Sequence, residues 1–419
     1  MTAMEKKDKN LNVPNLRFPE FSGEWERSNL KRFATKITKK NKGNMCSNVL
    51  SNSANYGIIP QSDFFDRSIA NSDNTDTYYV IEGGDFVYNP RKSTAAPYGP
   101  INVYEGTEVG IISPLYLCFK VEWINKKYLY HYFKSNKWHP YMYINGDSGA
   151  RHDRVSIKDD VFLDMPLFVP SQKEQLKITL LLDAIDKRIE TQKKIIEDLK
   201  KLKGAIAEKL FCAPEEESPE LRIVNSSDRW ISYRLKDVCQ RVSERNSQGL
   251  SSLVLTIAAQ YGLVSQTDFF NKSVASENLS NYYLIQKGDF AYNKSYSREY
   301  VWGAVKRLEL YEKGVLSPLY ICFRPNPLIV NSDFLSHYFE THKWHNGIAQ
   351  IAGEGARNHG LLNVSISDYF ATLHRLPGLA EQKKIASYLN MLSDKISLAN
   401  KELKCYSSQK QYLLARMFI

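Results

Sequence analysis

The apolar and polar positions of the chain follow two patterns, and each pattern occurs twice. From Gln172 to Leu210, apolar residues recur at alternating intervals of four and three positions, and no Gly or Pro occurs before Gly204. The same spacing returns 207 positions later (385 − 178). Such a heptad pattern predicts a long helix that packs against a partner along one stripe. We predict an antiparallel coiled coil formed by Ile178, Leu182, Ile185, Ile189, Ile196 and Leu199 of the first helix and Ile385, Leu389, Leu392, Ile396, Leu403 and Tyr406 of the second.

The segments before the two helices have shorter apolar runs. Residues 78–81, 86–88 and 115–119 are β-rich and are separated by Gly, Pro, Asn and Ser. Short runs between turn-forming residues are typical of an irregular α+β domain. Residues 213–219 are mostly polar and proline-containing, which indicates an exposed linker that lets the second part of the chain swing.

The whole chain is a tandem duplication. The sequence SPLYLCF at 113–119 returns as SPLYICF at 317–323, an offset of 204 (317 − 113). Lys-Trp-His at 137–139 returns at 343–345, an offset of 206 (343 − 137). Because the offset changes so little along the chain, we expect two copies of one fold. The fold class predicted is therefore α+β, with two α+β domains that are each followed by a long helix.

Composition favours a soluble protein with a polyanionic partner. The chain has 56 Lys and Arg against 46 Asp and Glu, a net charge of +10, and its pI is near 9.0. A basic balance of this kind is compatible with nucleic-acid binding. There is no apolar run of membrane-spanning length and no signal-peptide pattern, so we expect a cytoplasmic location. The six cysteines show no CxxC spacing, which argues against a zinc ribbon or a redox pair.

Two pairs of loops differ between the copies although their flanking residues agree. Residues 89–110 and 293–314 keep Gly99 and Gly303 in register, but their interiors diverge. Arg, Lys, Ser, Tyr and Asn side chains can donate and accept hydrogen bonds at base edges, whereas solvent-facing loops that drift neutrally are the alternative. We predict DNA contacts by Asn89, Arg91, Lys92, Ser93, Tyr98, Arg151, His152 and Arg154 in the first copy and by Asn293, Lys294, Ser295, Tyr296, Arg298, Arg357, Asn358 and His359 in the second.

The sequence gives weaker support to a catalytic function or a metal site. The GDSG sequence at 146–149 is found around serine-protease nucleophiles, but the second copy reads GEG at 353–355, without a serine. His337 and His342 are five positions apart and would not share a helix face, so we expect no metal site. The chain has no Walker motif for ATP. Trp138 and Trp344, present in both copies, belong either to the core or to a surface that contacts a sugar-phosphate backbone.

The motifs of both copies resemble the specificity subunit of Type I restriction-modification enzymes. The resemblance covers essentially the full chain. One departure is Ser393, where the first copy has the family's usual aspartate at Asp186. The matching motifs are Pro-x-Leu-Arg at 14–17 and 219–222, Gly-Asp-Phe-x-Tyr-Asn at 84–89 and 288–293, Ser-Pro-Leu-Tyr at 113–116 and 317–320, and Pro-x-x-x-Glu-Gln-x-x-Ile at 170–178 and 377–385.

The resemblance implies a non-catalytic subunit with two target-recognition domains, each reading one half of a bipartite site in double-stranded DNA. Two methylation subunits would dock on its helices and carry S-adenosylmethionine, and restriction subunits would bring ATP and Mg, so this chain itself would hold no cofactor. The implied boundaries are an N-terminal tail at 1–12, the first domain at 13–170, a conserved helix at 171–212, a linker and second domain at 213–376, and a conserved helix at 377–419.

Two other functional classes stay open at the level of sequence. A scaffold that joins proteins through its coiled coil would need no DNA contacts, and its binding would be insensitive to salt. A self-sufficient nuclease or methyltransferase would be active as a purified single chain.

Overall fold

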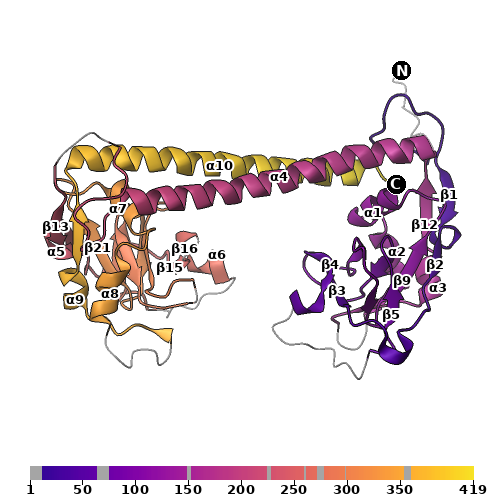
Figure 1. Ribbon diagram of the computed structural model, residues 1–419, viewed down its shortest axis with the longest axis horizontal. Coiled ribbons are helices and arrows are strands. Elements are labelled where there is room, and N and C mark those ends of the chain that lie inside the picture. The colour runs from indigo at the N-terminus through magenta and orange to yellow at the C-terminus, as the bar shows by residue number, and fades with distance from the viewer. Residues whose placement is uncertain are drawn as a thin grey trace, which may run out of the picture. The chain divides into compact units, whose positions relative to one another are not determined.

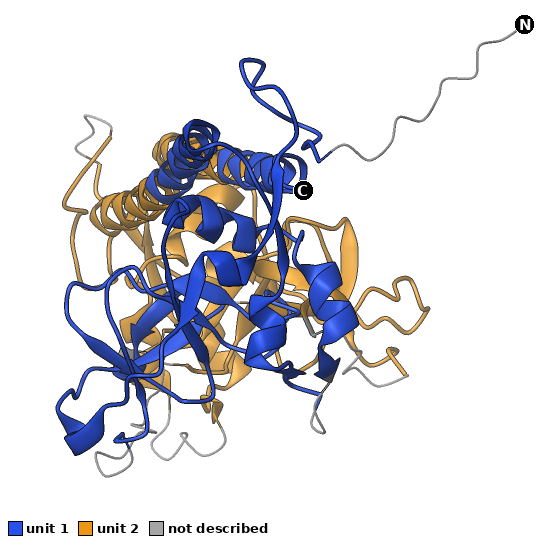
Figure 2. Ribbon diagram, turned by 90° about the vertical axis from the view of Figure 1, so that its right-hand side faces the viewer, with its two compact units in different colours: residues 1–192, 402–419 blue, residues 193–401 orange. Residues whose placement is uncertain are grey.

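The chain forms two compact units, each built around its own sheets. The structure is a computed structural model. Unit 1 comprises residues 1–192 and 402–419, and unit 2 comprises residues 193–401 (Figure 2). Secondary structure is described for residues 12–63, 75–148, 152–223, 228–258, 261–270, 278–297, 299–352 and 360–419, and side chains are described for the same residues except 63, 148 and 270.

Unit 1 contains two four-stranded sheets. One is antiparallel, in the order β2 (Ala34–Lys36), β9 (Leu117–Val121), β6 (Phe86–Tyr88) and β7 (Ile101–Val103). The other has the order β4 (Gly57–Pro60), β3 (Val49–Ser53), β8 (Gly110–Ile112) and β5 (Tyr79–Ile81), and β3 and β8 are parallel. The remaining elements are the pairs β1 (Glu26–Asn29) with β12 (Pro166–Val169) and β10 (Asp147–Ser148) with β11 (Val155–Ser156), and helices α1 (Lys126–Lys134), α2 (His139–Asn145) and α3 (Asp159–Leu163).

Unit 2 repeats this plan. Its four-stranded sheet has the order β14 (Cys239–Arg241), β21 (Ile321–Pro325), β18 (Phe290–Asn293) and β19 (Ala304–Arg307), which matches β2-β9-β6-β7 strand for strand. The other elements are the strand pairs β13 (Ile231–Arg234) with β22 (Leu373–Leu376), β15 (Leu255–Ala258) with β16 (Gly262–Ser265) and β17 (Tyr283–Gln286) with β20 (Lys313–Leu316), and helices α5 (Leu235–Val238), α6 (Gln266–Phe270), α7 (Ser332–Tyr338), α8 (His345–Ile351) and α9 (Ile366–Ala371). The predicted α+β duplication is confirmed.

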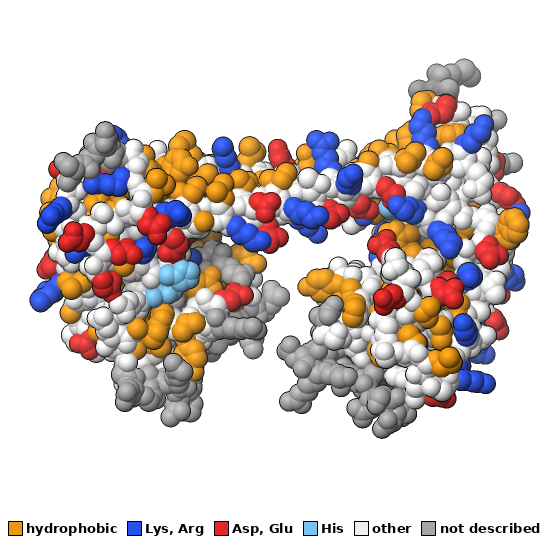
Figure 3. All heavy atoms as spheres, viewed as in Figure 1, with side chains coloured by type: hydrophobic (Ala, Val, Ile, Leu, Met, Phe, Trp, Pro, Cys, Tyr) orange, Lys and Arg blue, Asp and Glu red, His pale blue; other side chains and the backbone are white. Residues whose placement is uncertain are grey.

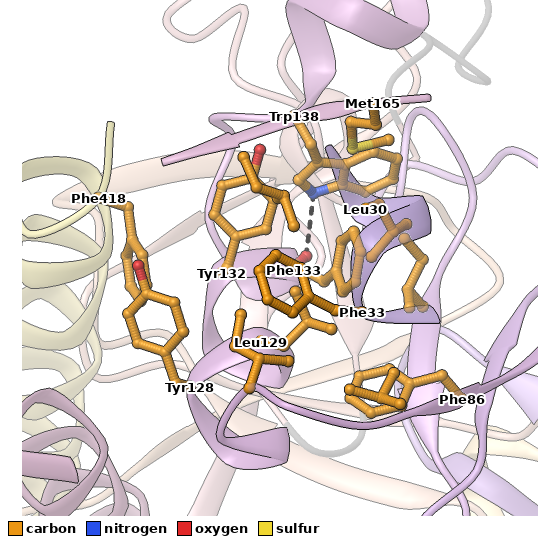
Figure 4. Close-up of a cluster of buried hydrophobic side chains, with 14 of the residues drawn as sticks. Leu30, Phe33, Phe86, Tyr128, Leu129, Tyr132, Phe133, Trp138, Met165 and Phe418 are labelled. Atoms are coloured by element: carbon orange, nitrogen blue, oxygen red, sulfur yellow. Dashed lines mark hydrogen bonds between the residues drawn. The ribbon is translucent and has the colours of Figure 1, made fainter. Parts of the chain in front are cut away.

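The duplication extends to the packing of aromatic rings in the two cores. Phe86 stacks on Phe119 with 5.3 Å between ring centroids, and Phe290 stacks on Phe323 at 5.4 Å. Trp138 is buried, and its indole N–H donates to the carbonyl oxygen of Phe133 at 3.1 Å (Figure 4). Trp344 is buried in the same way in unit 2. The two tryptophans therefore belong to the cores, and the alternative of a surface contact is excluded.

Two long helices, α4 (Gln172–Leu210) and α10 (Leu379–Arg416), each contribute a stretch to both units (Figure 1). In unit 1, Gln192 Nε2 donates to Glu402 Oε2 at 2.9 Å, and Lys410 pairs with Asp186. Contacts that advance along α4 therefore move backwards along α10, so the helices are antiparallel, as predicted. All twelve predicted pairing residues are buried or half-buried. Within the described residues, no helix is long and apolar enough to cross a membrane.

The ends of the heptad stripes also pack into the cores of the two units, which the spacing did not predict. Ile178, Leu182 and Ile185 belong to the aromatic core of unit 1, together with Leu413, Leu414, Met417 and Phe418 from the end of the chain. In unit 2, Ala207, Leu210 and Phe211 occupy the matching place beside Ile385, Ala386 and Leu389. Each core is thus completed by the C-terminal end of one long helix and the N-terminal part of the other.

The linker is exposed over residues 215–218, as predicted, but it is tied to unit 2. The carboxylate of Glu216 pairs with Lys343 at 2.8 Å and accepts from the backbone N–H of Ala213. The thiol of Cys212 donates to the carbonyl oxygen of Glu216 at 3.1 Å. These contacts fix the linker on unit 2, which differs from the swinging segment expected from its composition.

Candidate nucleic-acid interface

The loop that follows β6 is held by a set of hydrogen bonds that recurs after β18. Tyr88 Oη donates to the carbonyl oxygen of Tyr98 at 3.0 Å, and Tyr292 Oη donates to that of Trp302 at 3.0 Å. The side-chain oxygen of Asn89 accepts from the N–H of Arg91 at 3.0 Å, and that of Asn293 accepts from Ser295 at 3.0 Å. The two copies therefore hold loops of different sequence in the same backbone frame.

A glycine closes each of these loops because no other residue fits there. Gly99 has φ +83° and Gly303 has φ +79°, a region that side chains other than glycine rarely adopt. A Cβ atom would lie 2.1 Å from the carbonyl oxygen of Asn89 at Gly99, and 2.2 Å from that of Asn293 at Gly303. These backbone atoms cannot move aside without breaking the frame. The glycines kept in register are therefore structural.

A second segment pairs with each loop. In unit 1, Lys92 N–H donates to Asp153 at 2.8 Å and Val155 N–H donates to Pro90 at 2.9 Å, so that Arg91 lies opposite Arg154. In unit 2, Leu362 N–H donates to Lys294 at 2.9 Å and Tyr296 N–H donates to Gly360 at 3.1 Å. In each unit the loop thus forms a short two-stranded ribbon with a segment distant in sequence, residues 153–155 in unit 1 and residues 360–362 in unit 2.

Arg91 and Arg154 both act on the half-buried hydroxyl of Tyr116. Burial raises the pKa of Tyr116, whereas a hydrogen bond with the side chain of Ser51 and the positive charges of Arg154 and Arg91 lower it. Tyr116 belongs to the Ser-Pro-Leu-Tyr sequence that recurs in both copies. The ribbon of unit 1 therefore carries two guanidinium groups whose fields overlap, a suitable arrangement for phosphate or guanine.

The predicted contact residues differ in exposure. Arg91, Ser93, His152, Arg154 and Ser295 are exposed, and Lys92, Tyr98, Lys294 and Tyr296 are half-exposed. Arg151, Arg298, Arg357, Asn358 and His359 lie outside the described residues, so their placement stays a prediction. The exposed residues of unit 1 come from both strands of its ribbon, which brings together the two predicted clusters.

Asn89 holds the loop from the inside. Only 9% of its surface is exposed. Its amide nitrogen donates to the carbonyl oxygen of Asn52 at 2.9 Å, and the side chain of Asn52 accepts at 2.6 Å from Asn102. The sequence analysis did not identify Asn52 and Asn102, because the second copy has Ile257 and Lys306 at the equivalent positions. Asn89 therefore positions its neighbours and has little surface left for a ligand.

The described residues of the other candidate sites have partners of their own. His337 Nε2 contacts Asn390 Oδ1 at 2.8 Å, and His342 Nδ1 contacts Glu208 at 2.7 Å, so the histidines have separate partners. Within the part of the chain that the structure describes, no three His, Cys, Asp or Glu side chains are grouped as metal ligands. Asp147 of the GDSG sequence lies opposite Ser156 in a two-stranded pair.

Comparison with known proteins gives matches in structure only. No protein-family model and no curated protein matches the sequence. The HsdS subunit from Thermoanaerobacter tengcongensis aligns with a TM-score of 0.45 at 14% identity, over 94% of this chain and 96% of that chain. The type I restriction-modification S subunit from M. genitalium aligns with 0.49 at 14% identity, over 97% and 99%.

One further structure is similar enough to support an argument about the fold. It describes the complex assembly and conformational transition of the type I R-M system, and one of its chains aligns with a TM-score of 0.54 at 13% identity. The alignment covers 93% of this chain and 96% of that chain. The sequence resemblance named above and this structural likeness are independent observations that agree. This chain therefore has the fold of that type I R-M chain along nearly its whole length.

Proposed function

We propose that this chain is the sequence-specific DNA-binding subunit of a Type I restriction-modification complex. Each unit would read one half of a bipartite target through the ribbon described above. Exposed residues such as Arg91, His152 and Arg154 would contact bases or phosphates in unit 1. The chain would contribute no catalytic residue, since methyl transfer, ATP and Mg would belong to partner subunits.

The observation that carries this proposal is that the two loops share the same set of hydrogen bonds but expose different side chains. The same tyrosine, asparagine and glycine hold both loops, whereas the exposed positions differ, as in Arg91 against Ser295. Two readers of related but different half-sites require this combination, because the backbone must approach DNA in the same way while the side chains recognise different bases. A scaffold protein has no need for it.

The helices are proposed to dock the methylation subunits. Leu176 and Leu180 of α4 in unit 1 and Met391 and Leu398 of α10 in unit 2 are each more than half exposed. Figure 3 shows hydrophobic side chains exposed on the helical part of unit 2. Large apolar side chains on an otherwise polar helix surface are typical of protein contacts.

An exchange of ribbons tests the function. Residues 89–110 and 150–154 of unit 1 would be replaced by residues 293–314 and 356–360 of unit 2. Long-read mapping of methylated adenines in cells that carry this chain and its methylation subunit should then show the half-site of unit 2 in both halves of the target. A methylated sequence that is unchanged by the exchange, or DNA binding that does not weaken with salt, would contradict the proposal.

A further inference from the structure

The two units contain equivalent cavities beside the loops that follow β6 and β18, residues 89–110 and 293–314, which we call the recognition loops after their proposed role. The cavity of unit 1 has a volume of about 370 Å³ and is lined by residues that include Gly99, Lys134, Trp138 and Lys410. The cavity of unit 2, about 280 Å³, includes the equivalent Gly303, Glu340 and Trp344. Position 134 of the first copy corresponds to position 340 of the second, at an offset of 206 (340 − 134).

The cavity of unit 2 balances its own charge. Lys203 Nζ lies 2.8 Å from Glu340 Oε2, and His337 Nδ1 lies 3.6 Å from the same oxygen. Desolvation would raise the pKa of Glu340, but the nearby His337 and the ammonium of Lys203 lower it to about 2. Glu340 is therefore ionised at neutral pH, and its negative charge is matched by Lys203.

The cavity of unit 1 has the opposite charge at this position. Lys134 replaces the glutamate, and its ammonium donates to Asn102 Oδ1 at 2.5 Å and lies 3.4 Å from the carbonyl oxygen of Ile101. Both acceptors are neutral. Burial lowers the pKa of Lys134 to about 8, and the positive charge of Lys410 adds to this effect, whereas the negative charge of Asp186 acts in the opposite direction. Lys134 is still mostly protonated at neutral pH, in a half-buried position without a matching negative charge in its hydrogen bonds.

Lys410 has a different partner from its counterpart in unit 2. It corresponds to Lys203 at an offset of 207 (410 − 203), but it pairs with Asp186, where the second copy has Ser393. The three positions together carry a net charge of +1 in unit 1, from Lys134, Asp186 and Lys410. The equivalent Glu340, Ser393 and Lys203 carry a net charge of zero. Of the described Asp, Glu, Lys and Arg residues, only Lys134 and Lys410 line the unit 1 cavity.

We propose that the cavity of unit 1 is a binding site for the oxyanion of a small molecule, a phosphate or carboxylate group held by Lys134 and supported by Lys410. A cavity of this volume is within the usual range for small ligands. An anion would supply the opposite charge that Glu340 supplies in unit 2, and a charge-assisted hydrogen bond to Lys134 would be stronger than its present bonds to neutral oxygens. The site is separate from the proposed DNA-reading function and does not depend on it.

Isothermal titration of the purified full chain, free of nucleic acid, tests the site with inorganic phosphate and acetate as probes. We expect at least one anion to bind, and the tighter of the two identifies the ligand group. The variant Lys134→Met should weaken binding about tenfold or more, the loss of one charge-assisted hydrogen bond. Asp186→Asn should strengthen binding about threefold, because it frees Lys410 to face the cavity.

The matched control is Lys187→Met, which removes one exposed positive charge from α4 in unit 1 and should leave the affinity unchanged. Lys134→Gln serves as a second variant if Lys134→Met does not fold, as judged by circular dichroism. Absence of heat from both anions at about 10 mM would overturn the proposal, since weaker binding has no use at cellular concentrations. Equal affinity of the wild-type chain and the two Lys134 variants would overturn it as well, because binding would then reside elsewhere.

Discussion

Single residues in the two copies show which sequence matches are structural. The Leu-Arg and Glu-Gln motifs shared with the Type I family meet each other: Arg17 Nε lies 2.7 Å from Glu174 Oε1, and Gln175 accepts from the N–H of Asn125 at 2.9 Å. Arg222 and Glu381 form the same pair in unit 2. These motifs anchor the start of each long helix on its unit, so their recurrence in both copies reflects the fold.

The glycine at the end of the recognition loop gives the first residue-scale prediction. Gly99→Ala should destabilise unit 1 by about 3 kcal/mol, because it combines a positive φ with a contact of 2.1 Å to the backbone oxygen of Asn89. Gly57→Ala is the matched control in the same unit, since Gly57 has φ +75° but no atom within 4 Å of its Cβ position. It should cost about 1 kcal/mol in urea unfolding. Equal losses would show that the close contact relaxes.

Acid sensitivity of unit 2 gives a second prediction at the same scale. Burial lowers the pKa of His374 to about 4. The hydroxyl of Thr372 donates to Tyr369, so His374 Nε2 donates to Thr372 at 2.8 Å, and its Nδ1 accepts from Tyr338 at 3.1 Å. The unfolded histidine has a pKa of about 6.5 and binds a proton first as pH falls. Stability from this group is therefore complete above pH 6.5 and declines below it, by about 2 kcal/mol at pH 5.

The variant His374→Leu isolates this effect, because Leu167 occupies the equivalent position of unit 1 at an offset of 207 (374 − 167). Urea unfolding at pH 7 and pH 5 should show a smaller difference between the two conditions in the variant. Loss of the acceptor for Tyr338 lowers stability equally at both values. His152→Asn, which changes an exposed histidine, should keep the wild-type difference. A variant with an unaltered pH dependence would assign the acid sensitivity to other groups.

At the scale of elements, heptad spacing predicted the long helices but not all of their partners. The predicted bounds of the first helix, Gln172 to Leu210, are those observed, because a long apolar stripe without Pro, and without Gly before Gly204, has few other structures available. The heptad spacing does not indicate which residues pack against the apolar stripe. Ile178 and Leu182 are covered largely by the aromatic core of unit 1, which no local pattern could indicate.

For the recognition loops, too, the sequence predicted only part of the structure. The repeated Tyr-Asn and Gly positions predicted a common frame, and this frame is present in both units. The amide of Asn89 was assigned to base contacts, but it bonds backbone instead. An amide side chain can bond either to DNA or to the protein backbone, and only the burial seen in the structure distinguishes these two roles. The partner strand of each ribbon was also beyond prediction, since it lies about 60 residues away in sequence and pairs with the loop only after folding.

The salt bridge at the start of α4 gives the prediction for this scale. Glu174 is 1% exposed and accepts from both Arg17 and the indole of Trp25. Arg17→Leu would leave a buried carboxylate without its cation and should lower the free energy of unfolding by about 3 kcal/mol. The double variant with Glu174→Leu should recover much of the loss, since the charge is then gone. Lys201→Ala breaks the exposed pair with Glu197 and should leave the free energy of unfolding nearly unchanged.

For the molecule as a whole, the duplication extends to the contacts at the C-terminal ends of the two long helices. In unit 2, the N–H of Leu221 donates to Lys209 at 2.9 Å, joining the segment after the linker to the end of α4. In unit 1, the N–H of Leu16 donates to Arg416 at 2.9 Å, so the segment near the N-terminus meets the end of α10 in the same way. The ring of Phe418 lies 5.3 Å from Tyr128, as Phe211 lies 4.9 Å from Phe334. The segment around Leu16 and the end of α10 in unit 1 are therefore arranged like the segment around Leu221 and the end of α4 in unit 2.

A circular permutation tests this equivalence. Ile419 would be joined to Val13 by a copy of residues 213–218, and new ends would be opened between Glu217 and Ser218, which are both exposed. Because the core contacts of Phe211 and Phe418 are kept, the permuted chain should unfold within about 1 kcal/mol of the wild type in urea. Opening the same joined chain between Leu182 and Asp183, inside α4, should prevent folding because it divides the helix at a buried position. If the first permutant fails to fold as the second does, the linker and the terminal segments are not interchangeable, and the equivalence holds only for the packed cores.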